Sequence, residues 1–317
     1  MNTAVEDRRI RGLRPHKPAV DPWRAHGTEI EEERRPNGSV ERALTIFLAG
    51  AECPFTCSFC DLWRWTIDKP TPRGALPAQI GSVLESLNGL TRPDRLKLYN
   101  ASNFFDKRAV PHEDVPAIAS LVAQFAGVTV ESHASMLGPS VLDLSRRING
   151  RLEVAIGLET IHPEASARLN KRLELATFDR AAAFLGGNEI DLRVFVLLGA
   201  PHVPAAESVE WTVRTVEYAV SRGASVVSII PVRGGNGELE RLQSLGLFTP
   251  PTLSQLETSL DPCLTFAPSV VSADLWDIDR LADCSACAAA RVARLKRINV
   301  TGRAEARVAC SLCHSSG

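Results

Sequence analysis

Short apolar runs alternate with longer amphipathic stretches along the chain from residue 44 onward. This alternation is typical of strands that each lead into a helix, and such units build a parallel sheet. Strands are expected at 44–48, 95–99, 128–131, 153–156, 192–198 and 225–230. Helices are expected at 76–87, 112–125, 139–148, 163–184 and 206–221. The pattern therefore predicts an α/β fold in which the βα units form a curved, partly open (β/α)6 barrel.

The two ends of the chain break this pattern. Residues 1–40 are polar and rich in proline, so we expect a loosely ordered arm outside the core with about one helical turn. After Pro231, a glycine-rich segment at 233–237 leads to helical segments near 254–260 and 288–298. The expected organisation is a polar N-terminal arm (1–40), a barrel core (41–235) and a C-terminal extension (236–317).

Composition excludes several classes of protein. The 317 residues carry 36 lysines and arginines against 37 acidic residues, a net charge of −1, so no bulk positive field marks a nucleic-acid binder. The longest clear apolar run, 43–51, is too short to cross a bilayer, and the first 35 residues have no apolar signal core. We expect a cytoplasmic protein that does not span a membrane.

Three of the eight cysteines, Cys53, Cys57 and Cys60, lie on one loop directly after the first predicted strand. In the reducing cytoplasm such clusters are better interpreted as ligands than as disulfides. Three thiolates can hold three irons of a 4Fe-4S cluster and leave the fourth iron without a protein ligand. Zinc is the alternative, but a closed zinc site needs four ligands, and no cysteine or histidine follows nearby to supply the fourth.

In this strand context the C-x3-C-x2-C motif resembles that of the radical S-adenosylmethionine (SAM) superfamily, over about residues 43–235. The resemblance implies a partial radical SAM barrel in which the amino and carboxylate groups of SAM chelate the open iron. One electron from the cluster would cleave SAM to methionine and a 5′-deoxyadenosyl radical, which abstracts hydrogen from the substrate. It also implies a one-electron donor, such as flavodoxin or ferredoxin, as a partner.

The same resemblance assigns cofactor contacts. Phe59 is the aromatic residue that precedes the last cysteine of the motif. Many members carry a Gly-Gly-Glu run after the second strand, whose backbone meets the amino group of SAM. This chain departs from that pattern, and within its residues 99–106 the candidates for the amino contact are Asn100 and Ser102.

Three further segments, 130–132, 157–160 and 169–172, resemble the branch that contains the Elp3-type proteins and the radical SAM subunit of archaeosine synthase. By that resemblance Lys171 meets the carboxylate of SAM, and Glu131 or Glu159 binds its amino or ribose groups. The alternative for each carboxylate is an ordinary ion pair at a strand end.

The C-terminal extension contains a second cysteine set. Two pairs, Cys284 with Cys287 and Cys310 with Cys313, are separated by 22 residues, a spacing that strongly indicates a metal site. Either a structural zinc ion or a second, auxiliary 4Fe-4S cluster fits four thiolates. His314 is a possible replacement for one sulfur, and Cys263 is expected to be a small core residue.

The segment between the two pairs is basic, with Arg291, Arg294, Lys296, Arg297, Arg303 and Arg307 opposed only by Glu305. It forms either a cationic face for phosphate or a solvated helix surface. The expected function is a radical SAM enzyme that acts on a nucleoside or tRNA-related substrate. Carbon–hydrogen chemistry on a small metabolite is the first alternative, and a noncatalytic iron-sulfur protein is the second.

Overall fold

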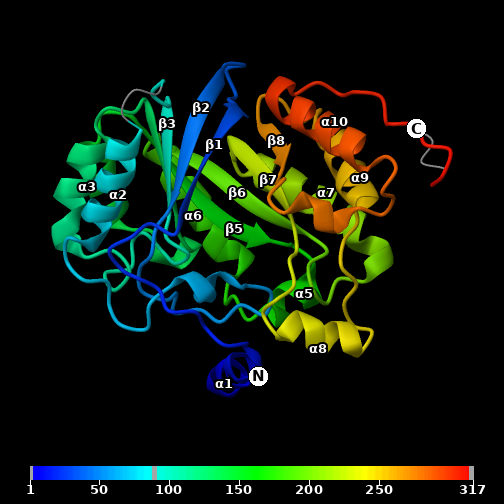
Figure 1. Ribbon diagram of the computed structural model, residues 1–317, viewed down its shortest axis with the longest axis horizontal. Helices are drawn as coiled ribbons and strands as arrows, with labels where there is room; N and C mark the ends of the chain where they lie inside the picture. The colour runs from blue at the N-terminus through cyan, green and yellow to red at the C-terminus, as the bar shows by residue number, and fades with distance from the viewer. Residues whose placement is uncertain (1–2, 88–90, 314–317) are drawn as a thin grey trace.

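One eight-stranded sheet forms the centre of the computed structural model, which describes residues 3–87 and 91–313 (Figure 1). The sheet order follows the chain, and every neighbouring pair is parallel except the first, which is antiparallel. The strands are β1 (Gly27–Arg34), β2 (Val40–Phe47), β3 (Arg95–Tyr99), β4 (Gly127–Glu131), β5 (Arg151–Glu159), β6 (Asp191–Leu198), β7 (Val226–Pro231) and β8 (Val270–Ala273). The predicted α/β class and partial barrel are confirmed, and all the predicted strands are present.

Helices connect the parallel strands and pack against the outer face of the sheet. The α-helices are α1 (Thr3–Leu13), α2 (Ala75–Ser86), α3 (Val115–Val122), α4 (Pro139–Arg147), α5 (Pro163–Arg168), α6 (Leu175–Gly187), α7 (Ser208–Ser221), α8 (Glu238–Ser244), α9 (Leu253–Cys263) and α10 (Ala288–Thr301). Short 3-10 turns are η1 (Leu62–Trp65), η2 (His112–Asp114), η3 (Ala134–Met136), η4 (Ala205–Glu207) and η5 (Ile278–Leu281). None of the helices in the described residues is long and apolar enough to cross a membrane.

The single helix expected at 163–184 is instead two helices, α5 and α6, separated by a loop at 169–174. Asn170 and Arg172 adopt left-handed backbone conformations there, with φ of 53° and 59°. A helix cannot continue through such residues, because each would place Cβ against the following carbonyl. The break carries Lys171 out of helical structure and toward the carboxyl ends of the strands.

The two faces of the sheet differ sharply in chemistry. Outward side chains such as Leu44, Leu96 and Val154 belong to the large apolar core beneath the helices. Inward side chains are largely charged or polar: Lys97, Glu153 and Arg193 are each no more than 3 % exposed. Alternation along a strand places successive residues on opposite faces, so both sets arise from the same strands.

Buried ion pairs connect the inward charges. Arg193 contacts Glu153 at 2.7 Å and Glu33 at 2.9 Å, and Arg35 contacts the other oxygen of Glu153 at 2.8 Å. Lys97 contacts Glu33 at 2.8 Å. Burial alone would raise the pKa of Glu33, but Arg193 and Lys97 hold it at about 2. The network therefore joins β1, β3, β5 and β6 across the barrel interior.

The network also explains why the prediction for residues 1–40 was wrong. Instead of a loosely ordered arm, this segment forms α1 and the edge strand β1. The sequence of β1 has four glutamates and one isoleucine, so it shows no apolar alternation. It pairs with β2, and Glu31 and Glu33 each contact the buried Lys97. The strand is held by charges that lie elsewhere in the sequence.

Helix α10 lies against both edge strands, β1 and β8, as Figure 1 shows. The Asn299 side chain donates to the carbonyl of Ala273 and accepts from its N–H, at 2.8 and 2.9 Å. Arg34 of β1 donates to the carbonyl of Thr301. An exposed strand edge carries unpaired backbone groups, so α10 covers the seam between the two edges of the open barrel.

Substituting Arg193→Met should lower the free energy of unfolding by about 3–5 kcal/mol, because Glu153 and Glu33 would lose a shared partner in a buried site. Urea unfolding followed by circular dichroism measures the change. Arg214→Ala is the control, since its pair with Glu210 is more than half exposed and should be worth less than about 1 kcal/mol. Equal effects of the two substitutions would contradict the role of the network.

Candidate cofactor site

Cys53, Cys57 and Cys60 lie on the loop between β2 and η1, at the carboxyl edge of the parallel sheet. All three thiols are free and partly exposed. A parallel bridge between Ala51 and Ile67 closes the base of the loop. The predicted location of the cysteines after the first parallel strand is therefore correct.

Segments distant in the sequence hold this loop in place. Asn170 donates to the carbonyl and hydroxyl oxygens of Thr56 at 2.9 and 2.8 Å, and to Asp7 of α1 at 2.9 Å. The buried Asn236 donates to the carbonyl of Ser58 at 2.7 Å. The Ser58 N–H donates to the carbonyl of Leu169 at 2.8 Å. The loop is thus clamped from α1, from the 169–174 break and from the start of the C-terminal extension.

The three thiols lack the lowered pKa of reactive nucleophiles. Burial raises the pKa of all three, that of Cys57 to about 12, although Lys171 opposes the shift at Cys53 and Cys57. Asn103 Nδ2 donates to Cys53 Sγ at 3.3 Å. A bound metal deprotonates a coordinating thiol outright, so these cysteines need a metal to become thiolates.

Three cysteines on one loop suit a cluster with an open iron better than a closed single-ion site, which needs four ligands. Among the described residues, only the C-terminal cysteine set has its ligand atoms all within 4.8 Å of one another. Sulfurs around a single tetrahedral zinc lie about 3.8 Å apart, since each Zn–S bond is about 2.3 Å. A cubane binds each cysteine at a different iron, which requires a wider spacing. Three free thiols without a fourth ligand are the donor set that a 4Fe-4S cluster with one open iron uses.

Several buried polar atoms beside the loop lack partners. The amide nitrogen and oxygen of Asn100, the hydroxyl of Ser102 and Oε1 of Glu131 are buried without a hydrogen bond. Asn100 directly follows β3 and Glu131 is the last residue of β4, so these atoms gather at the same sheet edge as the cysteines. Buried polar groups are nearly always satisfied, and unpaired ones indicate a missing ligand or water. They fit a polar ligand such as the amino-acid end of SAM.

Glu131 is the one carboxylate at this edge with a strongly raised pKa. Burial raises its pKa to about 7, while the backbone N–H groups of residues 100–102 and Lys171 oppose the shift. A cationic ligand group at Oε1 would favour the ionised form and lower this pKa. The arrangement therefore suits the ammonium group of an amino acid.

Lys171 and Glu159 contact each other at 2.7 Å, and Lys171 Nζ lies 6.0 Å from the centre of the Phe59 ring. Burial would lower the pKa of Lys171, but Glu159 and Cys57 raise it above its ordinary value. For Glu159 the alternative of an ion pair at a strand end is thus present. A Cβ at Gly157 would lie 2.7 Å from Lys171 Nζ and 2.0 Å from a Glu159 oxygen, so glycine leaves room for the pair.

Sequence reasoning missed Asp7, Asn103, His133, Asn170 and Asn236. Asn103 lies inside the segment singled out for the amino contact, but its neighbours Asn100 and Ser102 were chosen instead. Its Oδ1 accepts a hydrogen bond from the His133 N–H at 2.6 Å, and its Nδ2 donates one to Cys53 Sγ. Asn103 therefore links the loop after β4 to the loop after β2. No local signal marks such a role, because the partners of these side chains are distant in sequence.

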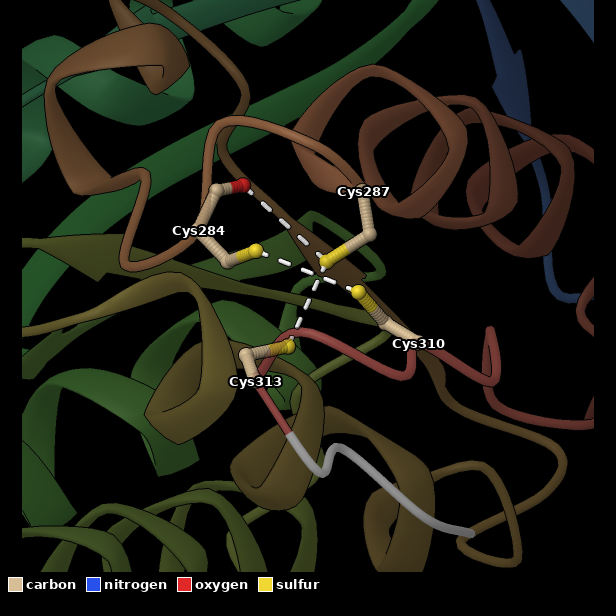
Figure 2. A group of neighbouring side chains, drawn as sticks. All are labelled: Cys284, Cys287, Cys310 and Cys313. Atoms are coloured by element: carbon tan, nitrogen blue, oxygen red, sulfur yellow. Dashed lines mark hydrogen bonds between the residues drawn. The ribbon is translucent and has the colours of Figure 1, made fainter.

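The four C-terminal cysteines come together as predicted, and Figure 2 shows their sulfurs pointing toward a common centre. His314, the possible replacement ligand, lies outside the described residues. The basic segment between the pairs is not a free cationic face. Arg291 and Arg294 are buried and contact Glu257, and Arg297 contacts Glu305. The expectation of an exposed basic surface at Arg291 and Arg294 was therefore wrong.

A groove of about 440 Å³ opens beside Cys53. Its lining includes four cations, Arg11, Arg14, Lys17 and Arg108, and two carboxylates, Glu52 and Asp68. Glu52 contacts Arg14 and Lys17, and Asp68 contacts Lys17. The groove thus keeps an excess of positive charge next to a predicted cluster ligand.

No protein-family model and no curated protein sequence matches the chain. Solved structures match it by fold. Elp3 from the archaeon Methanocaldococcus infernus, with an N-terminal deletion, is 13 % identical at a TM-score of 0.53, and the match covers 74 % of this chain and 60 % of that one. The fold of this chain is therefore similar to that of the Elp3 structure. The chain spans about three fifths of the length of this Elp3 structure.

Two further structures are similar at lower scores. Methylornithine synthase (PylB) is 15 % identical, with a TM-score of 0.45 over 72 % of this chain and 71 % of that one. Coproporphyrinogen III oxidase (HemN) from Escherichia coli, described as a radical SAM enzyme, is 11 % identical, with a TM-score of 0.46 over 74 % and 52 %. At these identities the similarity concerns the fold, so activity must be argued from the site.

Substituting Asp7→Asn should lower the free energy of unfolding by about 1 kcal/mol at pH 7, since solvent screens its pair with Arg172. Burial raises the pKa of Asp7, but bonds from Arg172, Thr56 and Asn170 lower it from 3.8 to about 2. The ionised carboxylate therefore stabilises the fold above about pH 4, and this contribution is lost as the pH falls toward 2. Urea unfolding of both proteins between about pH 7 and pH 3 tests this. A difference that does not shrink at the acidic end would contradict it.

Proposed function

We propose that this chain is a radical SAM enzyme. A 4Fe-4S cluster on Cys53, Cys57 and Cys60 would supply one electron to cleave SAM, giving methionine and a 5′-deoxyadenosyl radical that abstracts hydrogen from the substrate. One observation carries the proposal: three free thiols and a group of unpartnered buried polar atoms lie together at the carboxyl edge of a parallel sheet. Ligands of barrel and open α/β sheets bind at that edge.

The protein side chains orient the amino-acid end of SAM. Asn100, Ser102 and Glu131 offer the unpaired atoms for its amino group, and Lys171 offers a cation for its carboxylate. Glu159 holds the Lys171 ammonium in position, and Phe59 lines the same space. Asn103 fixes the side chain of Cys53 through its bond to the sulfur. Lys171 and Asn103 are preorganised by contacts within the protein, which limits the reorganisation needed on binding.

The electron donor in this proposal is an acidic one-electron carrier such as flavodoxin or ferredoxin. The groove beside Cys53 supports this partner, because its lining has more cations than carboxylates and attracts negative charge. The proposed setting is the cytoplasm, where the thiols stay reduced until they bind metal. The division into domains at residues 40 and 235 stays a prediction, although the sheet itself includes β1 and β8 from outside these boundaries.

For the substrate we propose a nucleoside or a comparable nucleotide fragment. The ring centres of Tyr99 and Phe195 lie 6.1 Å apart, edge to face, on the inner face of the sheet. Those of Phe47 and Trp276 lie 5.6 Å apart. Such rings stack on planar bases. Intact tRNA is less favoured, because Arg291 and Arg294 are buried in ion pairs and offer no phosphate contacts.

Anaerobic reconstitution of the purified protein with iron and sulfide, followed by dithionite and SAM, should yield 5′-deoxyadenosine detectable by mass spectrometry. Substituting Cys57→Ala should reduce this product at least about a hundredfold, since the cluster loses one of three protein ligands. Cys263→Ala is the control, because Cys263 is a lone buried core residue. Full cleavage by Cys57→Ala, or the absence of product from the wild type, would refute the enzyme and favour a noncatalytic iron-sulfur protein.

The substrate class is tested by adding free nucleosides, nuclease-digested tRNA or intact tRNA to the reconstituted enzyme. We expect nucleosides to increase 5′-deoxyadenosine formation several-fold, with substrate hydrogen transferred to the product, because a base can stack against the inward aromatic rings. Stimulation by intact tRNA alone would show that the substrate is a polymer. If none of the three stimulates cleavage, the small-metabolite alternative replaces the nucleoside.

A further inference from the structure

We infer that the C-terminal cysteine set binds one tetrahedral zinc ion, and that this ion fixes the cover over the seam of the barrel. The inference concerns Cys284, Cys287, Cys310 and Cys313 and does not depend on the proposed radical chemistry. It excludes an auxiliary cluster at this site.

The sulfur positions carry the assignment. Cys284 Sγ lies 3.9 Å from Cys310 Sγ, and Cys287 Sγ lies 3.7 Å from Cys313 Sγ. The four ligand atoms all lie within 4.8 Å of one another. The edge of a zinc–thiolate tetrahedron is about 3.8 Å, so both measured pairs match it. A cubane with one cysteine on each iron cannot be built on sulfurs this close together.

The two short sulfur–sulfur distances also cross between the two cysteine pairs of the sequence. We call the Cys284/Cys287 pair the first knuckle and the Cys310/Cys313 pair the second. Each short distance joins one sulfur of the first knuckle, just before α10, with one sulfur of the second knuckle, as Figure 2 shows. A disulfide would require one such pair to approach to about 2 Å, which neither does. Four thiolates around one centre are therefore the arrangement that the backbone provides. Among divalent ions that accept tetrahedral thiolate ligands, zinc binds more tightly than ferrous iron.

Buried arginines hold both knuckles in place independently of the metal. Arg291 contacts Glu257 of α9 at 2.7 Å. It also contacts Asp283, which precedes Cys284 of the first knuckle, at 2.5 Å. Arg294 donates to the carbonyls of Glu305 and Ala306, in the segment that leads to the second knuckle. These bonds place the two knuckles within reach of one ion, so little chain entropy is lost when the ion binds.

The site has a definite mechanical position. Cys287 is the N-cap residue of α10, and α10 covers the edges of both β1 and β8. Binding would join residues 310–313 to the start of this helix. The ion would thereby restrain α10, the helix that covers the free edges of β1 and β8 and limits their pairing with other chains.

The metals are counted by elemental mass spectrometry on three full-length proteins: the wild type, a Cys284→Ser/Cys310→Ser variant, and a Cys53→Ala/Cys57→Ala/Cys60→Ala variant. The wild type and the triple variant should each hold about one zinc per chain, and the double variant should hold none. The double variant should still bind iron after reconstitution. Cys263→Ser is the matched control, since it removes a buried thiol outside the set.

Two further measurements use folded wild-type protein, in case the double variant does not fold. Replacing the native metal with Co²⁺ should give the visible absorption of a tetrahedral cobalt–thiolate centre. Removing the metal with a chelator should increase amide hydrogen exchange in α10 and in β1 and β8, while α3 stays unchanged.

Loss of about four irons from the double variant would overturn the inference in favour of an auxiliary cluster. One iron in place of zinc would overturn the identity of the ion, and unchanged exchange in the edge strands would overturn its mechanical role. The outcome is separable from that of the proposed function. The triple variant abolishes the radical site and leaves the zinc count intact if the inference holds, whatever the wild type does with SAM.

Discussion

The ion pairs inside the barrel are the interaction on which the rest of the structure depends. Glu153 is fully buried and is paired with Arg193 and Arg35, and Glu33 is paired with Arg193 and Lys97. Buried charges are costly unless each has a partner, so these side chains must face one another across the interior. That requirement brings β1 alongside β2 and gives the sheet an interior lined with charge.

A curved sheet with a polar interior sets the position of the candidate site. The carboxyl ends of β2, β3 and β4 meet at one edge and bring the cysteine loop beside Asn100 and Glu131. The loop is then fixed from outside, by Asp7 and by the backbone break at Asn170. Rigid support from several elements keeps the cysteines in place, while the polar atoms beside them stay free for a ligand.

The two cysteine sets differ in the number of ligands that they offer. The N-terminal loop provides three cysteines, and the C-terminal set provides four whose sulfurs lie within the distance of a single-ion shell. The first arrangement leaves room for a cluster with an open coordination position, which chemistry requires. The second is closed by four sulfurs, which suits a structural ion. In the functions proposed above, the same residue type would bind a reactive cluster at one place and a structural ion at the other.

The sequence by itself determined the α/β class, the six central parallel strands, the location of Cys53, Cys57 and Cys60 after a strand, and the grouping of the four C-terminal cysteines. These features are local: apolar alternation, strand length and cysteine spacing can all be read within a few residues. Tertiary structure decided the acidic strand β1, the buried pairs of Arg291 and Arg294, and the contacts of Asn103 and Asp7. The contacts that decide these features join residues about thirty or more positions apart, such as Glu33 with Lys97 and Asp7 with Asn170. A side chain's charge or hydrogen-bonding capacity does not reveal which distant group will satisfy it.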